Sequence, residues 1–386
     1  MPTCRACREP LELVFADLGE QPLSNSYLDS PDDPDPRYPL VARLCHRCLL
    51  VQADEVVHPD EIFAPGYAFV SGASAPWRDH CRAYVAKMMG RFCPGSVLEI
   101  ASNDGTLLTQ FPGRVRTLGV DPAGIPAPVE TIHKFFTSSL ADQLDPADLV
   151  IANNVLGHVP DINDFLEGLR KVTRNVATIE FPWLLNLIRL GQYDTIYHEH
   201  FSYWSLVALE DALQTSGLHP FDAEELDVHG GSLRVYVSPE QRPSTRSYTN
   251  LRRRETLFGL NDPLSAAYQG FQERVVWHST ALRTFFDKPG VKVGAGAPAK
   301  GNTLLNTAGI GADAMACTTD TSPYKQGKYL PGSHIPIRTP AEVDMVRPDY
   351  LFILAWNWAD AIKANFATIR EWGGRFVVPI PNLEIT

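Results

Sequence analysis

Long apolar runs and an excess of positive charge are both missing from this 386-residue sequence. No apolar run approaches the roughly 20 residues that a helix needs to cross a bilayer, and residues 1–13 hold no apolar core of signal-peptide length. The formal net charge is −11, which argues against a general binder of nucleic-acid phosphates. We therefore expect a cytoplasmic protein without membrane or nucleic-acid partners.

Three common nucleotide-binding and repeat patterns are also missing. There is no GxGxxG dinucleotide fingerprint, no P-loop ending in GKS or GKT, and no close internal repeat. An even set of cysteines typical of a disulfide framework is absent as well, because the sequence has 7. Hydrophobic residues make up 44% of the chain, enough for the cores of two or three domains.

Four of the cysteines form two close pairs. Cys4 and Cys7 are separated by two residues, as are Cys45 and Cys48. Each CxxC turn presents two thiolates, and two such turns complete a tetrahedral zinc site with no position left for water, so the expected role is structural. Unrelated buried cysteines or a redox pair are the alternatives.

The order of expected elements predicts an α/β chain in three parts. A cysteine-bearing segment, 1–75, with little regular periodicity, precedes an alternation of apolar strands and amphipathic helices over 76–245, which predicts a doubly wound parallel sheet. A helical stretch and a second alternation follow over 246–386. The expected strands lie at 96–100, 117–121, 148–154, 176–181, 291–296, 315–320, 349–356 and 375–381.

A loop of small and polar residues follows the strand at 96–100 and leads toward an expected helix. Small residues allow a ligand to approach the backbone, and an acid at the end of the next strand, Asp121, can accept hydrogen bonds from both ribose hydroxyls. A ribose-binding acid without a pyrophosphate loop favours S-adenosylmethionine over a dinucleotide, and a non-binding turn is the third possibility. The expected donor site consists of Ala101, Ser102, Asn103, Asp104, Gly105, Asp121, Pro122 and Asn153.

Two further clusters carry polar chemistry. The segment 194–205 groups Tyr197, His198, Glu199 and His200, which suits an acid–base site, although a second metal site or a structural turn would also fit. Near 293–306, Lys300 at an expected helix start suits a diphosphate, with a tight structural turn as the alternative.

Together these features resemble the zinc-containing deoxysugar C-methyltransferases of antibiotic and surface-sugar pathways. The matching strings cover nearly the whole chain in order: the cysteine pairs, EIASNDGTLL, NVLGHVPDINDF, YDTIYHEHFSYWSL, HGGSLRVYV, APAKGNTLLN and KQGKYLPGSHIPI. The resemblance implies a zinc-binding module, a central Rossmann-like class I methyltransferase domain and a C-terminal Rossmann-like αβα domain that helps to hold a nucleotide-sugar.

The resemblance also implies residue roles. His200 corresponds to the proposed base, with Glu199 and Tyr197 beside it and His158 as a further catalytic or sugar-contacting group. The expected substrate residues are Tyr67, Ser71, Ser74, Asn154, His158, Lys300 and Asn302. Phe69 and Gly72 replace a tyrosine and a serine common in the family, and VGAGAPAKG replaces the usual GYGAPAKG; both changes lie on the expected substrate side.

The reaction expected from these roles is transfer of a methyl group to the carbon beside the keto group of a nucleotide-linked deoxysugar, with dTDP as the expected nucleotide. A base would form an enolate, whose carbon would attack the methyl sulfonium. Alternatives are an O- or N-methyltransferase of another natural product, a non-catalytic protein with a donor fold, and an NAD-dependent sugar oxidoreductase. We expect a monomer; the sugar, the carbon and the face that is methylated stay open, as does the choice between His200 and His198.

Overall fold

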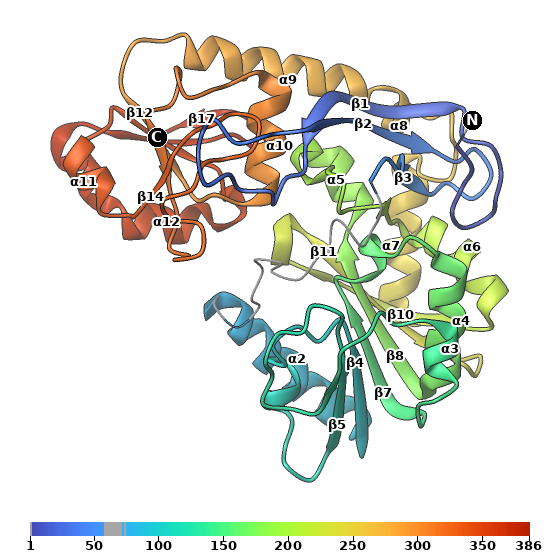
Figure 1. Cartoon of the computed structure of the whole chain (residues 1–386). Helices are drawn as coiled ribbons and strands as arrows, with labels where there is room; N and C mark the ends of the chain where they lie inside the picture. The colour runs from blue at the N-terminus through green and yellow to red at the C-terminus, as the bar shows by residue number, and fades with distance from the viewer. Residues whose placement is uncertain (1, 58–71, 73–74) are drawn as a thin grey trace.

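Three β-sheets with their helices make up the computed structural model, which describes residues 2–57, 72 and 75–386 (Figure 1). The N-terminal strands lie along the top of the molecule in Figure 1, beside helix α9 (Phe271–Phe286), with the central sheet below them. The C-terminal sheet lies at the upper left of the same view. Within the described part of the chain, no helix combines the length and apolarity needed to cross a membrane.

The N-terminal sheet is antiparallel, with strand order β1-β2-β3-β9. Although the sequence before residue 75 has little regular periodicity, a long hairpin pairs β1 with β2 from Leu13 opposite Leu44 to Pro22 opposite Arg37. The fourth strand, β9, comes from the histidine-rich segment far along the chain. The bounds are β1 Leu13–Pro22, β2 Arg37–Leu44, β3 Val51–Ala53 and β9 Ser202–Tyr203.

The central sheet has seven strands in the order β10-β11-β8-β7-β4-β5-β6. Strands β4 to β8 are parallel, whereas β11 runs antiparallel to β8 and to β10. The chain therefore winds first to one side of β4 and then to the other, which places a topological switch point between β4 and β7. The strands are β4 Ser96–Ile100, β5 Arg116–Val120, β6 Thr131–Ile132, β7 Ala147–Asn153, β8 Thr173–Pro182, β10 His219–Leu226 and β11 Ser232–Ser238.

Apolar side chains cover both faces of this sheet, as expected for parallel strands buried between helices. Val97 and Leu149 pack in one cluster with Tyr84 and Met88 of α2, whereas Leu98 lies in the larger core on the other face. The helices of this part are α2 Ala75–Phe92, α3 Ser138–Ala141, α4 Ile162–Val172, α5 Leu184–Leu190 and α6 Leu206–Ser216, with the short 3₁₀ segments η2 Leu108–Gln110, η3 Leu156–His158, η4 Tyr193–Thr195 and η5 Val228–Gly230.

Two long helices follow, α7 (Arg246–Phe258) and α9, with the short α8 (Ala266–Gln269) between them. Helix α7 packs on β10 and α6, whereas α9 packs on β1 and α10. The helical stretch thus connects the central sheet to the N-terminal hairpin and the C-terminal sheet. The division of the chain after residues 75 and 245 stays a prediction.

The C-terminal sheet has the order β14-β13-β12-β15-β16-β17, with β17 as the antiparallel edge strand. Its first strand, β12, lies between β13 and β15, so this sheet also has a switch point, at the carboxyl end of β12. The strands are β12 Lys292–Ala295, β13 Cys317–Thr319, β14 Ile337–Arg338, β15 Tyr350–Ile353, β16 Arg375–Val378 and β17 Glu384–Ile385, and the helices are α10 Ala299–Ala308, α11 Glu342–Val346, η6 Trp356–Trp358, α12 Ala359–Asn365 and η7 Ala367–Trp372.

The predicted α/β class is confirmed by these sheets. All the strands expected in the two alternating parts of the chain are present, with boundaries that differ by a few residues. The exception to the expected pattern follows residues 101–105, the loop expected to bind the methyl donor, which we call the donor loop. The element after this loop is the three-residue η2 and not an α-helix. Pro112 closes this segment shortly before β5 begins, leaving too little chain for a full helix.

Candidate active site

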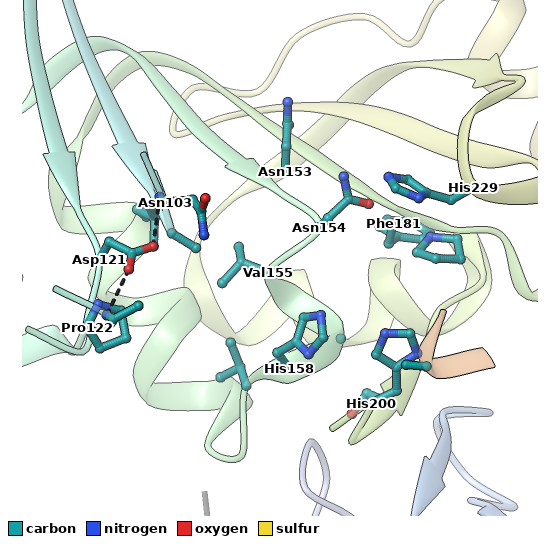
Figure 2. A pocket seen from close by; sticks show the side chains of 18 of the residues that line it. Asn103, Asp121, Pro122, Asn153, Asn154, Val155, His158, Phe181, His200 and His229 are labelled. Atoms are coloured by element: carbon teal, nitrogen blue, oxygen red, sulfur yellow. Dashed lines mark hydrogen bonds between the residues drawn. The ribbon is translucent and has the colours of Figure 1, made fainter. Parts of the chain in front are cut away.

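A cavity of about 770 Å³ lies where the carboxyl ends of strands from the two parallel sheets face each other. Its walls come from the ends of β4, β5, β7 and β8 of the central sheet and from the segments that follow β12 and β15 of the C-terminal sheet. Asn25 and Glu55 of the N-terminal part also line it. Figure 2 shows the side of this cavity that the central sheet forms, with Asp121 and Asn103 at one end and His158, His200 and His229 at the other.

The four paired cysteines meet in one cluster outside this cavity. Their Sγ atoms all lie within 4.8 Å of one another, and three of the four side chains are buried. Gln52 Nε2 donates a hydrogen bond to Cys4 Sγ at 3.2 Å, an outer contact typical of thiolates that hold a metal. The set of four sulfur ligands fits structural zinc, because no coordination position remains for a reacting water.

The donor loop begins directly after β4 and has an unusual backbone. Ala101 and Asn103 have φ angles of +60° and +52°, the left-handed region in which glycine is common. Gly105 has a φ of +72°, and a Cβ atom there would lie 2.6 Å from Val129. Such a loop turns tightly enough to expose its backbone to the cavity, which Ala101, Ser102 and Asn103 line, whereas Asp104 and Gly105 do not.

Asp121 follows β5 and is 5% exposed. Its two carboxylate oxygens accept hydrogen bonds from the backbone N–H groups of Asn103 and Ala123, each at 2.8 Å (Figure 2). Each oxygen retains a second lone pair for a ligand hydroxyl. Asp121 therefore fixes the donor loop in addition to facing the cavity, and Pro122 lines the cavity beside it.

Several buried polar atoms around this end of the cavity have no hydrogen-bond partner within the described part of the chain. They include both amide atoms of Asn153, the Ser102 hydroxyl and Oε2 of Glu99. Buried polar groups are rarely left unpaired, so these atoms indicate a polar ligand. Together with Asp121 they fit the ribose and amino-acid groups of S-adenosylmethionine.

Glu99 is a site residue that the sequence reading missed. Burial, followed by the nearby charges of Asp121 and Asp104, raises its pKa well above the ordinary value. As the fourth residue of an apolar strand it reads as part of the core. The available signal was that an acid is unusual within such a strand.

His200 lines the cavity from a turn just before β9. Because β9 pairs with β3, with Tyr203 opposite Val51, the N-terminal sheet holds this turn in place. The Nδ1–H group of His200 donates to the carbonyl oxygen of Thr195 at 2.7 Å. The neighbouring His198 lies elsewhere: its Nε2 bonds the Pro39 carbonyl oxygen at 3.2 Å, and it does not line the cavity.

The other expected catalytic residues surround His200. The ring centroids of Tyr197 and His158 lie 3.9 Å and 4.7 Å from that of His200, and both residues line the cavity. His158 Nδ1 bonds the Glu199 carbonyl oxygen at 2.8 Å. The Glu199 carboxylate accepts hydrogen bonds from the Asn25 side chain at 2.7 Å. The hydrogen bond that orients the His200 ring goes to the Thr195 carbonyl oxygen. The supporting role of Glu199 stays a prediction.

The expected substrate residues divide into three groups. Asn154 and Lys300 line the cavity from opposite sheets. Asn302 does not line it: its amide is 1% exposed and donates to the Ser24 carbonyl oxygen at 2.6 Å, which anchors α10 to the N-terminal part. The expected residues Tyr67, Ser71 and Ser74 lie outside the described part of the chain.

His229 is a second residue that the sequence reading missed. It lines the cavity with a φ of +55°, ahead of two glycines with positive φ, and its ring lies 5.7 Å from that of Trp77. Burial lowers its pKa to about 4, and the charge of Lys300 adds to this effect. The histidine before the paired glycines was visible in the sequence, but nothing there placed it at the cavity.

Three protein families match successive parts of the chain and together cover most of it. Residues 4–63 match a family described as a putative zinc binding domain, residues 77–221 match a methyltransferase domain, and residues 227–381 match a C-methyltransferase C-terminal domain. The order of the three matches is that of the three sheets.

A curated relative matches almost end to end. The C-methyltransferase NovU of Streptomyces niveus is 34% identical over 405 residues, covering 99% of this chain and 96% of that protein. Among solved structures, a 1,6-didemethyltoxoflavin-N1-methyltransferase of Burkholderia thailandensis is 16% identical, covers 49% of this chain and 95% of its own, and has a TM-score of 0.35. A magnesium protoporphyrin IX methyltransferase of Synechocystis is 13% identical, covers 42% and 78%, and has a TM-score of 0.32.

The full-length relative and the three matched domains identify the family of this chain. These matches confirm S-adenosylmethionine as the methyl donor, and the four-cysteine cluster confirms a structural zinc. The chain belongs to the family of zinc-containing, S-adenosylmethionine-dependent C-methyltransferases.

Proposed function

We propose that this C-methyltransferase acts on the carbon beside the keto group of a nucleotide-linked deoxysugar, with dTDP as the nucleotide. The observation that carries the proposal is the environment of His200, a neutral histidine in a cavity that has the donor loop at one end and Lys300 at another. Transfer to carbon requires removal of a proton from a carbon acid, which calls for such a base.

The hydrogen bond of His200 defines which nitrogen is available. A carbonyl oxygen accepts only, so Nδ1 carries the proton and Nε2 holds the lone pair. Burial, and next the neighbouring His158, lower the pKa of His200 well below its ordinary value. The imidazole is therefore neutral at neutral pH and ready to accept a proton.

Removal of the proton leaves negative charge on the keto oxygen of the substrate, and a donor group must face that oxygen. Asn154 supplies a candidate, because its Nδ2 is buried without a partner in the described part of the chain and the residue lines the cavity. Its φ of +54° holds it at the turn after β7. We assign enolate stabilisation to Asn154 and not to His158, because the Nδ1–H of His158 donates to the Glu199 carbonyl oxygen and burial lowers its pKa, which leaves Nε2 as an acceptor.

The nucleotide half of the substrate is assigned to the C-terminal sheet. Lys300 lies in the first turn of α10, after the switch-point strand β12, where backbone N–H groups and a positive charge favour a diphosphate.

The bound donor supplies an electrophilic methyl group on sulfur, to which the enolate carbon forms its new bond as the carbon–sulfur bond breaks. His200 then returns its proton to water.

Mass spectrometry after incubation of the protein with S-adenosylmethionine and a dTDP-linked deoxy-keto-sugar tests this proposal. The sugar product should gain one methyl group on carbon, stable to acid hydrolysis of the glycosidic phosphate. The matched control is the same nucleotide-sugar with the keto group reduced to a hydroxyl, which should give no product. Methylation of the reduced sugar at oxygen would contradict the proposal.

A further inference from the structure

Asp194 is a fully buried carboxylate in η4, four residues before His198 and six before His200. Its Oδ2 accepts a hydrogen bond from Nε1 of Trp356 at 2.6 Å, which joins the central part of the chain to η6 of the C-terminal sheet. Segment η4 also packs against α10. Asp194 does not line the cavity, so its charge acts there through other residues.

The residue that Asp194 influences is Lys300. The Lys300 ammonium lies over the Trp356 ring, with Nζ 4.5 Å from the ring centroid. Burial lowers the pKa of Lys300, and the charge of Asp194 opposes this effect. Among the described residues Lys300 forms no salt bridge, and Asp194 is the carboxylate whose charge acts on it.

Burial raises the pKa of Asp194 to about 6, partly offset by the charge of Lys300 and the indole hydrogen bond. The carboxylate is therefore ionised at pH 8. A histidine, His229, also faces Lys300, but its pKa of about 4 leaves it neutral there, and His200 is neutral as well. Neither histidine therefore adds a positive charge beside Asp194 and Lys300 at this pH.

The next residue in the chain connects the same turn to the base. Thr195 supplies the carbonyl oxygen that holds His200 Nδ1. One short 3₁₀ segment therefore positions the base through its backbone and the lysine through a side chain and an indole ring. A shift of η4 would move both groups together.

We propose that Asp194 is a positioning residue that keeps Lys300 charged and directed at the cavity, so that Lys300 binds the diphosphate of the substrate in register with His200. This inference rests on the proposed function, because it takes the anion to be the diphosphate of a nucleotide-sugar. It adds a carboxylate outside the cavity to the machinery that selects an anionic substrate.

The test compares three ligands in one variant. Asp194→Asn keeps an oxygen that can accept the Trp356 hydrogen bond but removes the charge. Calorimetry at pH 8 should show weaker binding of thymidine diphosphate by about ten-fold or more, as expected for a weakened charge-assisted contact. Binding of uncharged thymidine and of S-adenosylmethionine should not change, a pattern that a general loss of structure would not give.

Glu255→Gln is the matched control. Like Asp194, Glu255 is fully buried, lies outside the cavity lining and accepts an indole hydrogen bond, from Trp183 at 2.5 Å; its other hydrogen bonds come from the backbone N–H groups of Leu206 and Val207. This variant should bind thymidine diphosphate as the wild type does. Trp356→Phe keeps a ring under Lys300 without the indole N–H, and should weaken diphosphate binding less than Asp194→Asn.

The outcomes separate the inference from the proposed function. Equal thymidine diphosphate affinity in wild type and Asp194→Asn would overturn the role of Asp194 alone. Equal losses for thymidine and thymidine diphosphate would show a structural role and overturn it too. Failure of the wild type to bind thymidine diphosphate would overturn the proposed nucleotide-sugar function, and the inference with it. If Asp194→Asn does not fold, an unchanged diphosphate affinity in Trp356→Phe overturns the inference.

Discussion

At the scale of single residues, hydrogen bonds to backbone groups decide which side chains can react. The Thr195 carbonyl oxygen fixes the tautomer of His200, and the backbone amides of Asn103 and Ala123 fix the carboxylate of Asp121. Sequence alone identified His200 and Asp121 as candidates, because their residue types and spacing are informative. It could not identify their partners, since a carbonyl oxygen has no signature in the sequence.

The lowered pKa of His200 predicts the pH dependence of methyl transfer. The base acts in its neutral form, so activity is present above its pKa in the folded protein and lost as the pH falls through it. Because burial places that pKa well below the usual value of about 6.5, the rate should hold down to and below this pH. Single-turnover rates at saturating substrate measure it, since Asp194 also titrates near pH 6 and would affect substrate affinity. A rate already halved at pH 7 would contradict the prediction.

Asp121→Ala should weaken binding of S-adenosylmethionine by roughly 2–4 kcal/mol, because two hydrogen bonds to a charged group are lost. The donor loop also loses its anchor at the Asn103 amide. Asp121→Asn, which preserves one acceptor oxygen, should cause a smaller loss. Calorimetry should show little change in nucleotide-sugar binding for either variant, and an unchanged donor affinity in Asp121→Ala would show that the donor site is assigned wrongly.

At the scale of elements, the arrangement of the site depends on a pairing between distant segments. Strand β9 is two residues long and pairs with β3 of the zinc-bearing part, with Gln52 opposite Ser202. This pairing orients the preceding turn, so that His200 faces the cavity and His198 faces Pro39. The sequence left that choice open, because such a short strand has no periodicity and its partner lies about 150 residues away.

The left-handed backbone at Ala101 gives a prediction for the donor loop. Ala101→Gly should be tolerated, because glycine adopts the φ of +60° without steric cost. Ala101→Val should lower the free energy of unfolding by about 1–2 kcal/mol and weaken donor binding, because a β-branched residue fits this region poorly. Thermal unfolding with and without S-adenosylmethionine measures both effects. Equal stability of the two variants would contradict the strained geometry of the loop.

At the scale of the whole molecule, two switch points face one cavity, and the zinc-bearing part holds the base between them. The two alternating sheets were predictable, because apolar strands and amphipathic helices have clear periods. Their mutual arrangement was not, since it depends on contacts such as Trp356 with Asp194 and Asn302 with Ser24. That arrangement places Lys300 and the donor loop on the same cavity and leaves Asn302 outside it.

Metal analysis should find one zinc per chain. Cys45→Ser should lower the free energy of unfolding by roughly 3 kcal/mol or more, because metal-binding free energy is also folding free energy. In protein that stays folded, methyl transfer should fall more than donor affinity, since the zinc-bearing sheet orients His200 through β3 and β9. Cys93→Ser, at an exposed cysteine outside the cluster, is the control. Well-folded protein without metal would contradict the prediction.

The most direct test of the account is proton removal by His200. In D₂O with a dTDP-linked deoxy-keto-sugar, the wild type should exchange the hydrogen beside the keto group and methylate that carbon. His200→Asn should lose both activities, by about 10²–10⁴-fold, the usual contribution of a general base. Its affinities for S-adenosylmethionine and the nucleotide-sugar should stay near those of the wild type. Exchange and methylation at close to wild-type rates in His200→Asn would contradict the account, and the base would have to be sought at His158.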